Sequence, residues 1–368
     1  MCTNKIYNRL MENPLGTIAI LGSGETSPNL VSVHRELLAD INNSSNIYMI
    51  DSPFGFQENA NQLVEKIIDF YKVSLNVDMK LATYRKIEEL HSKSFFKSIK
   101  LLENASFIFA GPGSPSYASK LWNGNEFEQT LKNHLINGNN SLFASAAAST
   151  LGEYTLPVYE IYKVGQDPYW EKGLNILDVY GLSCTVVPHF NNAEGGNHDT
   201  SFSYVGENRM KTLLDNSYTN ILGIDEHTAL IISGKKETFK VIGIGNVTVL
   251  NKEGTHIFEK DSEESLSSLQ KLLISDKKSS VKRIDNIKTE VNSKDKATLR
   301  EIADLEIQIE TNNKNNERFE MLVENLILLR SELRNEKNYE LSDQVRDILE
   351  SSGLQIEDSE QGIQWKIT

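Results

Sequence analysis

Short apolar runs that end in turn residues alternate with longer amphipathic stretches between residues 16 and 258. Four of these runs occupy residues 16–21, 47–50, 105–110 and 141–144. The stretches between them include residues 60–71 and 127–136, where apolar positions recur at helical spacing. Short, continuously apolar strands separated by helices are typical of a parallel sheet buried on both faces. The pattern therefore predicts an α/β fold.

Further apolar runs lie at residues 184–187, 229–232, 241–244 and 247–250. The last two runs are separated only by Gly245 and Asn246, both of which favour turns. Two short strands joined in this way predict a hairpin, which we place at an edge of the sheet.

The composition limits the partners and the compartment that we expect. The chain has 368 residues, with 51 acidic and 38 basic side chains and a formal net charge of -13. A field of this sign opposes binding to duplex DNA. The polar N-terminus and the absence of a long apolar run predict neither a secretory signal nor a membrane span. Cys2 and Cys184 cannot build a disulfide framework, which favours the cytoplasm.

The composition changes near residue 276. Residues 276–296 hold seven Lys or Arg and four Asp or Glu with little apolar mass, which predicts a flexible linker. Apolar stripes at 319–333 and 339–349 predict two helices, and residues 354–367 predict a β-hairpin. We therefore expect an N-terminal tail at 1–15, an α/β domain at 16–275, a linker at 276–296 and a helical module at 297–368.

A serine follows the fourth apolar run at the point where a helix is expected to begin. Ser145 stands between residues 141–144 and a run of alanines. A serine on a tight strand-to-helix turn is held out of the sheet, and the next backbone N–H faces an oxyanion. Ala146 would supply that N–H, and Gly113, after an earlier strand, would supply a second. The competing interpretation is close helix–sheet packing by the alanines and a plain turn at Gly113.

His189 follows a later strand and is the candidate general base. A triad in the order serine, carboxylate, histidine is one of the known arrangements, and Glu153, Glu160 and Asp167 lie in the interval. A structural histidine is the alternative. A metal site at His189, His198 and Glu226 is a third interpretation, although no short metal-ligand spacing is present.

Several motifs together resemble the S51 serine peptidases, which include dipeptidase E and cyanophycinase. The resemblance covers roughly residues 16–258. The matching stretches are Gly22-Ser-Gly-Glu25, Gly111-Pro-Gly-Ser114, Ser145-Ala-Ala-Ala148 with Gly138 and Gly152, Pro188-His-Phe190, Gly206-Glu-Asn-Arg209 and Gly223-Ile-Asp-Glu-His-Thr-Ala229. Phe143 and Ala147 depart from the family pattern at the turn itself.

The resemblance implies a three-layer α/β/α sandwich of the class I glutamine amidotransferase-like type with a mostly parallel sheet. It also implies Ser145 as the nucleophile, His189 as the base and the N–H groups of Gly113 and Ala146 as the oxyanion hole. Glu160 is the orienting carboxylate that we favour by spacing. Arg209 occupies the position of a family arginine.

The last 50 residues or so resemble the C-terminal end of cysteinyl-tRNA synthetases. The ending Asp358-Ser-Glu-Gln-Gly362-Ile-Gln-Trp365 carries the likeness. Neither H-I-G-H nor K-M-S-K-S occurs, so we do not expect synthetase activity. We favour a small helical-hairpin packing or interaction module, and leave a tRNA and a protein partner open as alternatives for it.

These features together predict a serine hydrolase that acts on a small peptide or amide, with water as second substrate and no cofactor or metal. The residues expected to bind substrate are Arg209, Glu194, His198 and Glu226. The competing hypothesis is a catalytically inactive amidotransferase-like module that binds or regulates, with the tail docking a partner or tRNA.

Overall fold

The computed structural model describes residues 14–39, 41, 46–274 and 300, together with parts of the C-terminal region at 303–304, 307, 323–335, 337, 339–351, 354–359 and 362–367. The chain divides into two compact units, residues 1–300 and 301–368. The expected linker at 276–296 and most of the expected N-terminal tail lie outside the described residues.

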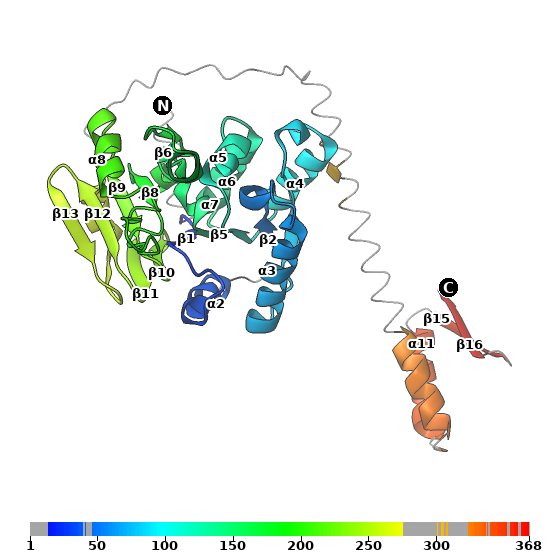
Figure 1. Ribbon diagram of the computed structural model, residues 1–368. Helices are drawn as coiled ribbons and strands as arrows, with labels where there is room; N and C mark the ends of the chain where they lie inside the picture. Colours follow the sequence, from blue (N-terminus) through cyan, green and yellow to red (C-terminus); the bar gives the residue numbers. More distant parts are fainter. Residues whose placement is uncertain are drawn as a thin grey trace, which may run out of the picture. The chain divides into compact units, whose positions relative to one another are not determined.

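An eight-stranded sheet forms the centre of the first unit (Figure 1), and the predicted α/β sandwich is confirmed. The strand order is β14-β11-β10-β1-β5-β4-β2-β3. The five strands from β1 to β3 in that order run parallel, and β10 pairs antiparallel with β1. The strand bounds are Thr17–Leu21 (β1), Ile47–Ile50 (β2), Lys80–Ala82 (β3), Phe107–Ala110 (β4), Asn140–Ala144 (β5), Thr228–Ser233 (β10), Thr238–Gly243 (β11) and Glu263–Ser265 (β14).

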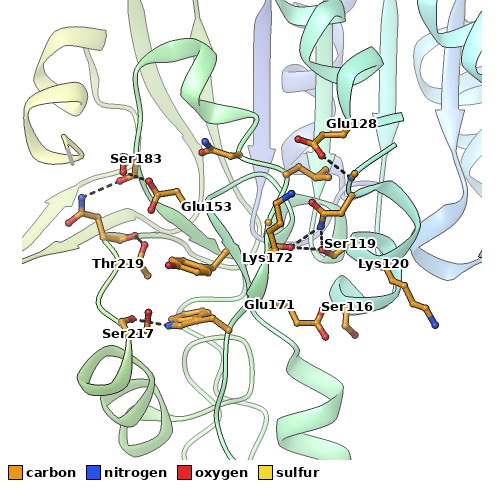
Figure 2. Close-up of a pocket in the computed structure, with 18 of the residues that line it drawn as sticks. Ser116, Ser119, Lys120, Glu128, Glu153, Glu171, Lys172, Ser183, Ser217 and Thr219 are labelled. Atoms are coloured by element: carbon orange, nitrogen blue, oxygen red, sulfur yellow. Dashed lines mark hydrogen bonds between the residues drawn. The ribbon is translucent and has the colours of Figure 1, made fainter. Parts of the chain in front are cut away.

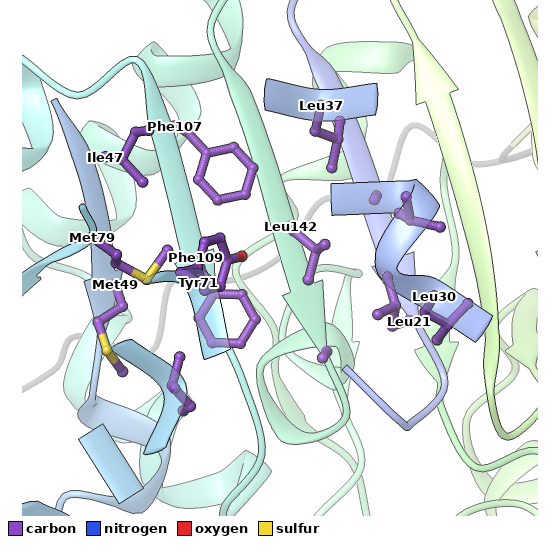
Figure 3. Packing of buried hydrophobic residues seen from close by; sticks show 14 of the residues in the cluster. Leu21, Leu30, Leu37, Ile47, Met49, Tyr71, Met79, Phe107, Phe109 and Leu142 are labelled. Atoms are coloured by element: carbon purple, nitrogen blue, oxygen red, sulfur yellow. The ribbon is translucent and has the colours of Figure 1, made fainter. Parts of the chain in front are cut away.

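Helices cover both faces of this sheet, as Figure 1 shows. One face packs against α2 and α3, and their contact with the strands forms a buried apolar cluster (Figure 3). Alternate residues of the strands, such as Met49, Phe109 and Leu142, enter that cluster because successive side chains point to opposite faces. The helices are α2 (Val31–Ala39), α3 (Ala60–Leu75), α4 (Lys93–Glu103), α5 (Pro115–Trp122), α6 (Glu126–Ile136), α7 (Ala146–Ser149), α8 (Glu207–Asn216) and α9 (Leu266–Leu272).

A second sheet of four strands, in the order β13-β12-β9-β8, lies beside the first. Its strands are β8 (Thr185–Val187), β9 (Ile221–Ile224), β12 (Val247–Asn251) and β13 (Gly254–Phe258). Strands β8 and β9 are parallel, with Val187 opposite Gly223. A short pair, β6 (Tyr154–Thr155) and β7 (Glu171–Lys172), encloses the helical turn η4 (Glu160–Val164).

The hairpin predicted around Gly245 and Asn246 is wrong. Strand β11 belongs to the large sheet and β12 to the small one. Asp225 redirects the chain here, because its Oδ2 accepts the Asn246 N–H at 2.8 Å and its own N–H donates to the Asn246 carbonyl at 3.2 Å. The turn therefore carries β12 across to β9 instead of back along β11.

In the second unit, residues 323–335 are helical, and a second helix, α11, spans Tyr339–Ser351. The predicted β-hairpin is confirmed as β15 (Leu354–Ser359) paired antiparallel with β16 (Gly362–Ile367). Val323, Leu349 and Leu354 form a small buried cluster among the described residues. No helix in the described part of the chain is long and apolar enough to cross a membrane.

Candidate active site

Ser145 occupies a strained turn between β5 and α7. Its backbone has φ 51° and ψ -118°, a region that non-glycine residues rarely adopt. Strain of this kind costs of order 1–3 kcal/mol and persists where the surroundings hold it. Here the Ser145 N–H donates to the Leu21 carbonyl at 3.0 Å, which ties the turn to the end of β1. Phe143 and Ala147, the residues two positions before and after Ser145, are both buried, and the turn forms with them in place.

His189 lies directly against the serine. Its Nε2 is 2.9 Å from Ser145 Oγ. The His189 N–H donates to the Gly22 carbonyl at 3.3 Å, so consecutive carbonyls at the end of β1 hold both residues. Position 22 requires glycine, because the Cβ of any other residue would lie 2.0 Å from the Asp225 carbonyl oxygen. The Gly22-Ser-Gly24 motif thus organises the backbone of the site.

The carboxylate against the other ring nitrogen of His189 belongs to Glu226. Its Oε1 is 3.0 Å from Nδ1 and also accepts a hydrogen bond from Asn192 Nδ2 at 2.7 Å. Because a carboxylate only accepts, Nδ1 carries the hydrogen and Nε2 is left to accept the Ser145 hydroxyl proton. Partial burial acts to raise the pKa of Glu226, but hydrogen bonds from His189 and Asn192 outweigh it and hold that pKa below its ordinary value.

Glu160 does not contact His189, which corrects the expectation based on spacing. It begins the turn η4, and its Oε1 accepts a hydrogen bond from Ser116 Oγ at 2.6 Å. The observed order along the chain is Ser145, His189, Glu226, so the carboxylate follows the histidine. The expected order had placed it between the two.

Gly113 and Ala146 lie on neighbouring backbone segments. Ala146 is the first residue of α7, where N–H groups have no intrahelical partner. The Ala147 N–H donates to the Gly111 carbonyl at 3.2 Å, which joins the turn at Ser145 to the loop of residues 111–114. Gly113 has φ 144°, and a Cβ there would lie 2.0 Å from the Pro53 carbonyl oxygen. Only glycine fits this position.

Aromatic side chains and a carboxylate surround His189 on one side. The Tyr204 ring centroid is 5.9 Å from that of His189, and Tyr204 Oη donates to Glu194 Oε2 at 2.9 Å. Tyr162 bridges Tyr204 to His198, at 5.6 and 6.1 Å between ring centroids. Glu194 and His198 therefore belong to the surroundings of the site. Burial, and then the Glu194 carboxylate, raise the pKa of Tyr204 to about 12.

The backbone that presents Tyr204 is itself strained. Phe202, Ser203 and Tyr204 all have positive φ. Ser203 holds this turn on the loop of His189, since its N–H donates to the His189 carbonyl at 3.2 Å and its hydroxyl donates to the Pro188 carbonyl. Arg209 lies on α8, and its Nη1 donates to the Val205 carbonyl at 3.3 Å, four residues earlier in the chain.

The described acidic and imidazole side chains near Ser145 do not form a metal site. Within the described ranges, no group of three or more His, Cys, Asp or Glu side chains has an arrangement that could hold a metal ion. His189, His198 and Glu226 therefore do not converge in the way that the third sequence interpretation required.

A groove of about 2080 Å³ adjoins the loop of residues 111–114 (Figure 2). Ser114, Ser116 and Glu160 lie at its wall, and Glu171, Trp170 and Tyr159 contribute acidic and aromatic surface. Burial, and then the charge of Glu160, raise the pKa of Glu171. Sequence reasoning did not find the groove, because its lining comes from segments far apart in the chain.

Comparison with known proteins establishes a fold and not a family. No family model matches the chain. The crystal structure of a peptidase from an acI-B1 Actinobacterium has a TM-score of 0.56 and 21% identity, covering 69% of this chain and 98% of that one. A structure assigned as a peptidase E protein from Listeria monocytogenes EGD-e has a TM-score of 0.40 and 12% identity, covering 63% of this chain and all of that one. The first likeness shows that this chain shares a fold with a peptidase.

The tail matches a different protein. A stretch of 47 residues is 47% identical to the cysteine–tRNA ligase of Thermococcus onnurineus (strain NA1), covering 13% of this chain and 10% of the ligase. This likeness agrees with the resemblance of the C-terminal end. The chain spans about a tenth of the ligase's length, so the match concerns one module.

Proposed function

We propose that the first unit is a serine hydrolase that cleaves a peptide or amide bond, with Ser145, His189 and Glu226 as its catalytic residues. The observation that carries this proposal is the continuous hydrogen-bonded chain from Ser145 Oγ through His189 to Glu226 Oε1. It occurs on a strained turn of the kind that exposes a nucleophile. The peptidase fold of the structural neighbour supports it.

The geometry supports the following reaction. As Ser145 Oγ attacks the substrate carbonyl carbon, its proton passes to His189 Nε2. The carbonyl oxygen becomes an anion, which the N–H groups of Gly113 and Ala146 would stabilise, each by ~3–4 kcal/mol. His189 then gives the proton to the leaving nitrogen, the C–N bond breaks, and an acyl-enzyme remains. Water hydrolyses the acyl-enzyme through the same proton transfers in reverse roles.

Glu226 has an orienting role in this scheme. It fixes the imidazole tautomer and stabilises the imidazolium that forms when Nε2 takes the proton. The hydrogen bond from Asn192 holds the carboxylate in place. Asn192 is 3% exposed, so water does not replace this contact easily.

Labelling with a fluorophosphonate probe tests the proposal. We expect the wild type to react, and Ser145→Ala and His189→Ala to lose the label while remaining folded by circular dichroism. Ser149→Ala is the matched control, because Ser149 lies on α7 and its buried hydroxyl has no partner among the described residues. Absence of labelling in folded wild type would contradict catalysis and favour the alternative of a binding module.

The C-terminal unit carries a separate proposal. We propose that it docks a partner, and its likeness to part of a cysteine–tRNA ligase makes tRNA the first partner to test. The full chain and a chain that ends at residue 275 should then differ in mobility-shift titrations with total tRNA. Equal mobility would leave a protein partner as the docking hypothesis.

A further inference from the structure

We propose that Glu160 is a positioning residue that holds the loop of residues 111–114, and with it the Gly113 N–H, through a relay of two serine hydroxyls. This inference rests on the proposed function, because it assigns a role toward the oxyanion hole. It gives Glu160 a place beside the catalytic residues without contact with His189.

The relay has one direction of donation. Ser116 Oγ lies 2.6 Å from Glu160 Oε1 and 3.0 Å from Ser114 Oγ. A carboxylate only accepts, so the single hydrogen of the Ser116 hydroxyl points to Glu160. Ser114 must therefore donate its own hydroxyl hydrogen to Ser116. Glu160 Oε1 is the final acceptor of the relay, so Glu160 anchors the chain.

The relay ends on the residue next to Gly113. Ser114 Oγ accepts the Tyr117 N–H at 3.2 Å and so caps α5, while the Ser114 N–H donates to the Pro53 carbonyl at 2.8 Å. With its hydroxyl hydrogen directed to Ser116, and with its carbonyl accepting the Ala118 N–H at 3.1 Å, Ser114 is fixed by four hydrogen bonds. The Gly113 N–H belongs to the peptide unit that precedes Gly113, and we infer that its direction depends on where Ser114 holds the next peptide unit. Displacement by even 1 Å of an oxyanion donor lowers the rate of the chemical step.

The position of Glu160 lowers the stability of the folded protein, so a contribution to stability does not explain why a glutamate is present there. Its second oxygen, Oε2, is buried and has no hydrogen-bond partner among the described residues. An unsatisfied buried polar atom destabilises the folded protein, because it loses its hydrogen bonds to water and gains none in return. Such atoms are uncommon in native proteins and often mark functional positions. The relay through Oε1 supplies a reason to keep a side-chain acceptor at this position.

The test compares labelling kinetics of the full chain in four variants. Glu160→Gln keeps an oxygen that accepts from Ser116, whereas Glu160→Leu has similar size and no acceptor. Ser116→Ala breaks the relay at its centre. Glu128→Gln is the matched control, since Glu128 lies on the same groove (Figure 2) and its carboxylate contacts the Gly124 N–H and Lys132, outside the relay. Each variant's maximal labelling rate and half-saturating probe concentration are measured separately, with its melting temperature.

We expect Glu160→Leu and Ser116→Ala to lower the maximal labelling rate about 10- to 100-fold, less than the ~10²–10³-fold loss of a whole oxyanion donor. The half-saturating probe concentration of these variants should stay within about twofold of the wild-type value. Glu160→Gln should have most of the wild-type labelling rate. A purely structural role would lower the melting temperature without this rescue. Wild-type rates in Ser116→Ala overturn the relay, even if Glu160→Leu fails to fold. An unlabelled wild type overturns the proposed function itself, together with the relay that depends on it.

Discussion

Glu226 lies 3.0 Å from Nδ1 of His189 because each residue stands two positions beyond the end of a parallel strand. Strand β8 ends at Val187, β9 ends at Ile224, and Val187 is paired with Gly223. Carboxyl ends of adjacent parallel strands meet at one edge of a sheet. Ser145 reaches the same point from the other sheet, and the end of β1 joins the two.

Glu226→Gln should remove most of the labelling rate. The amide can present its NH₂ to Nδ1 or stabilise the wrong tautomer, and it cannot balance the imidazolium charge. By analogy with triads that lose their carboxylate, the loss is about 10⁴-fold. The time course of fluorophosphonate labelling, measured for Glu226→Gln beside Glu160→Gln, checks that Glu226 is the carboxylate that orients His189. A larger loss in Glu160→Gln would mean that the carboxylate has been misassigned.

Asn192→Ala should slow labelling by roughly tenfold and lower stability by about 1–3 kcal/mol. The change removes a hydrogen bond to a charged group at a buried position. Asn197→Ala, on the exposed part of the same loop, is the control for general loop effects. Urea denaturation and labelling rates measure both quantities. If the two alanine variants behave alike, Asn192 does not support Glu226.

Gly113→Ala should destabilise the protein and abolish most labelling, because the new Cβ would lie 2.0 Å from the Pro53 carbonyl oxygen. Gly165→Ala is the control that measures only the free energy needed to hold alanine at a positive φ. Gly165 also has positive φ, but an added Cβ there would have no atom within 4 Å and so no steric clash. We expect about 1–2 kcal/mol for Gly165→Ala and a larger loss for Gly113→Ala. Equal melting temperatures would show that the loop adapts easily.

His134 should make the protein less stable as the pH falls below 6.5. Burial lowers its pKa to about 4, so between pH 6.5 and 4 the unfolded chain binds a proton that the folded chain does not. The loss reaches about 2–3 kcal/mol near pH 4.5. His134→Gln keeps a donor for the Asn140 carbonyl and lacks this titration. Urea denaturation at pH 7 and 4.5 should show a smaller drop for the variant, whereas parallel curves would contradict the prediction.

Local patterns in the sequence were sufficient to predict the strands that carry Ser145 and His189. Each strand is a short apolar run with a turn residue after it, and burial on both faces leaves a clear signal. The tight turn at Ser145 was also predictable from the small residues that follow it. The final β-hairpin could be predicted for the same reason, because its pairing is local.

The carboxylate of the triad could not be predicted from spacing. Glu160 and Glu226 are both glutamates near expected turns, and only the pairing of β8 with β9 decides between them. That pairing joins residues 36 positions apart in a sheet whose existence the sequence did not indicate, since the run at 247–250 was assigned to a hairpin with 241–244. One signal was available in the sequence. Glu226 follows the end of β9 by two residues, just as His189 follows the end of β8 by two residues.

Mapping the site of covalent modification tests the role of Ser145, His189 and Glu226 most directly. Folded wild-type protein is incubated with a fluorophosphonate, and the adduct is located by intact-mass and peptide mass spectrometry. We predict a single adduct on Ser145, absent from Ser145→Ala and His189→Ala and strongly reduced in Glu226→Gln. A wild-type adduct on another residue, or none at all, would contradict it.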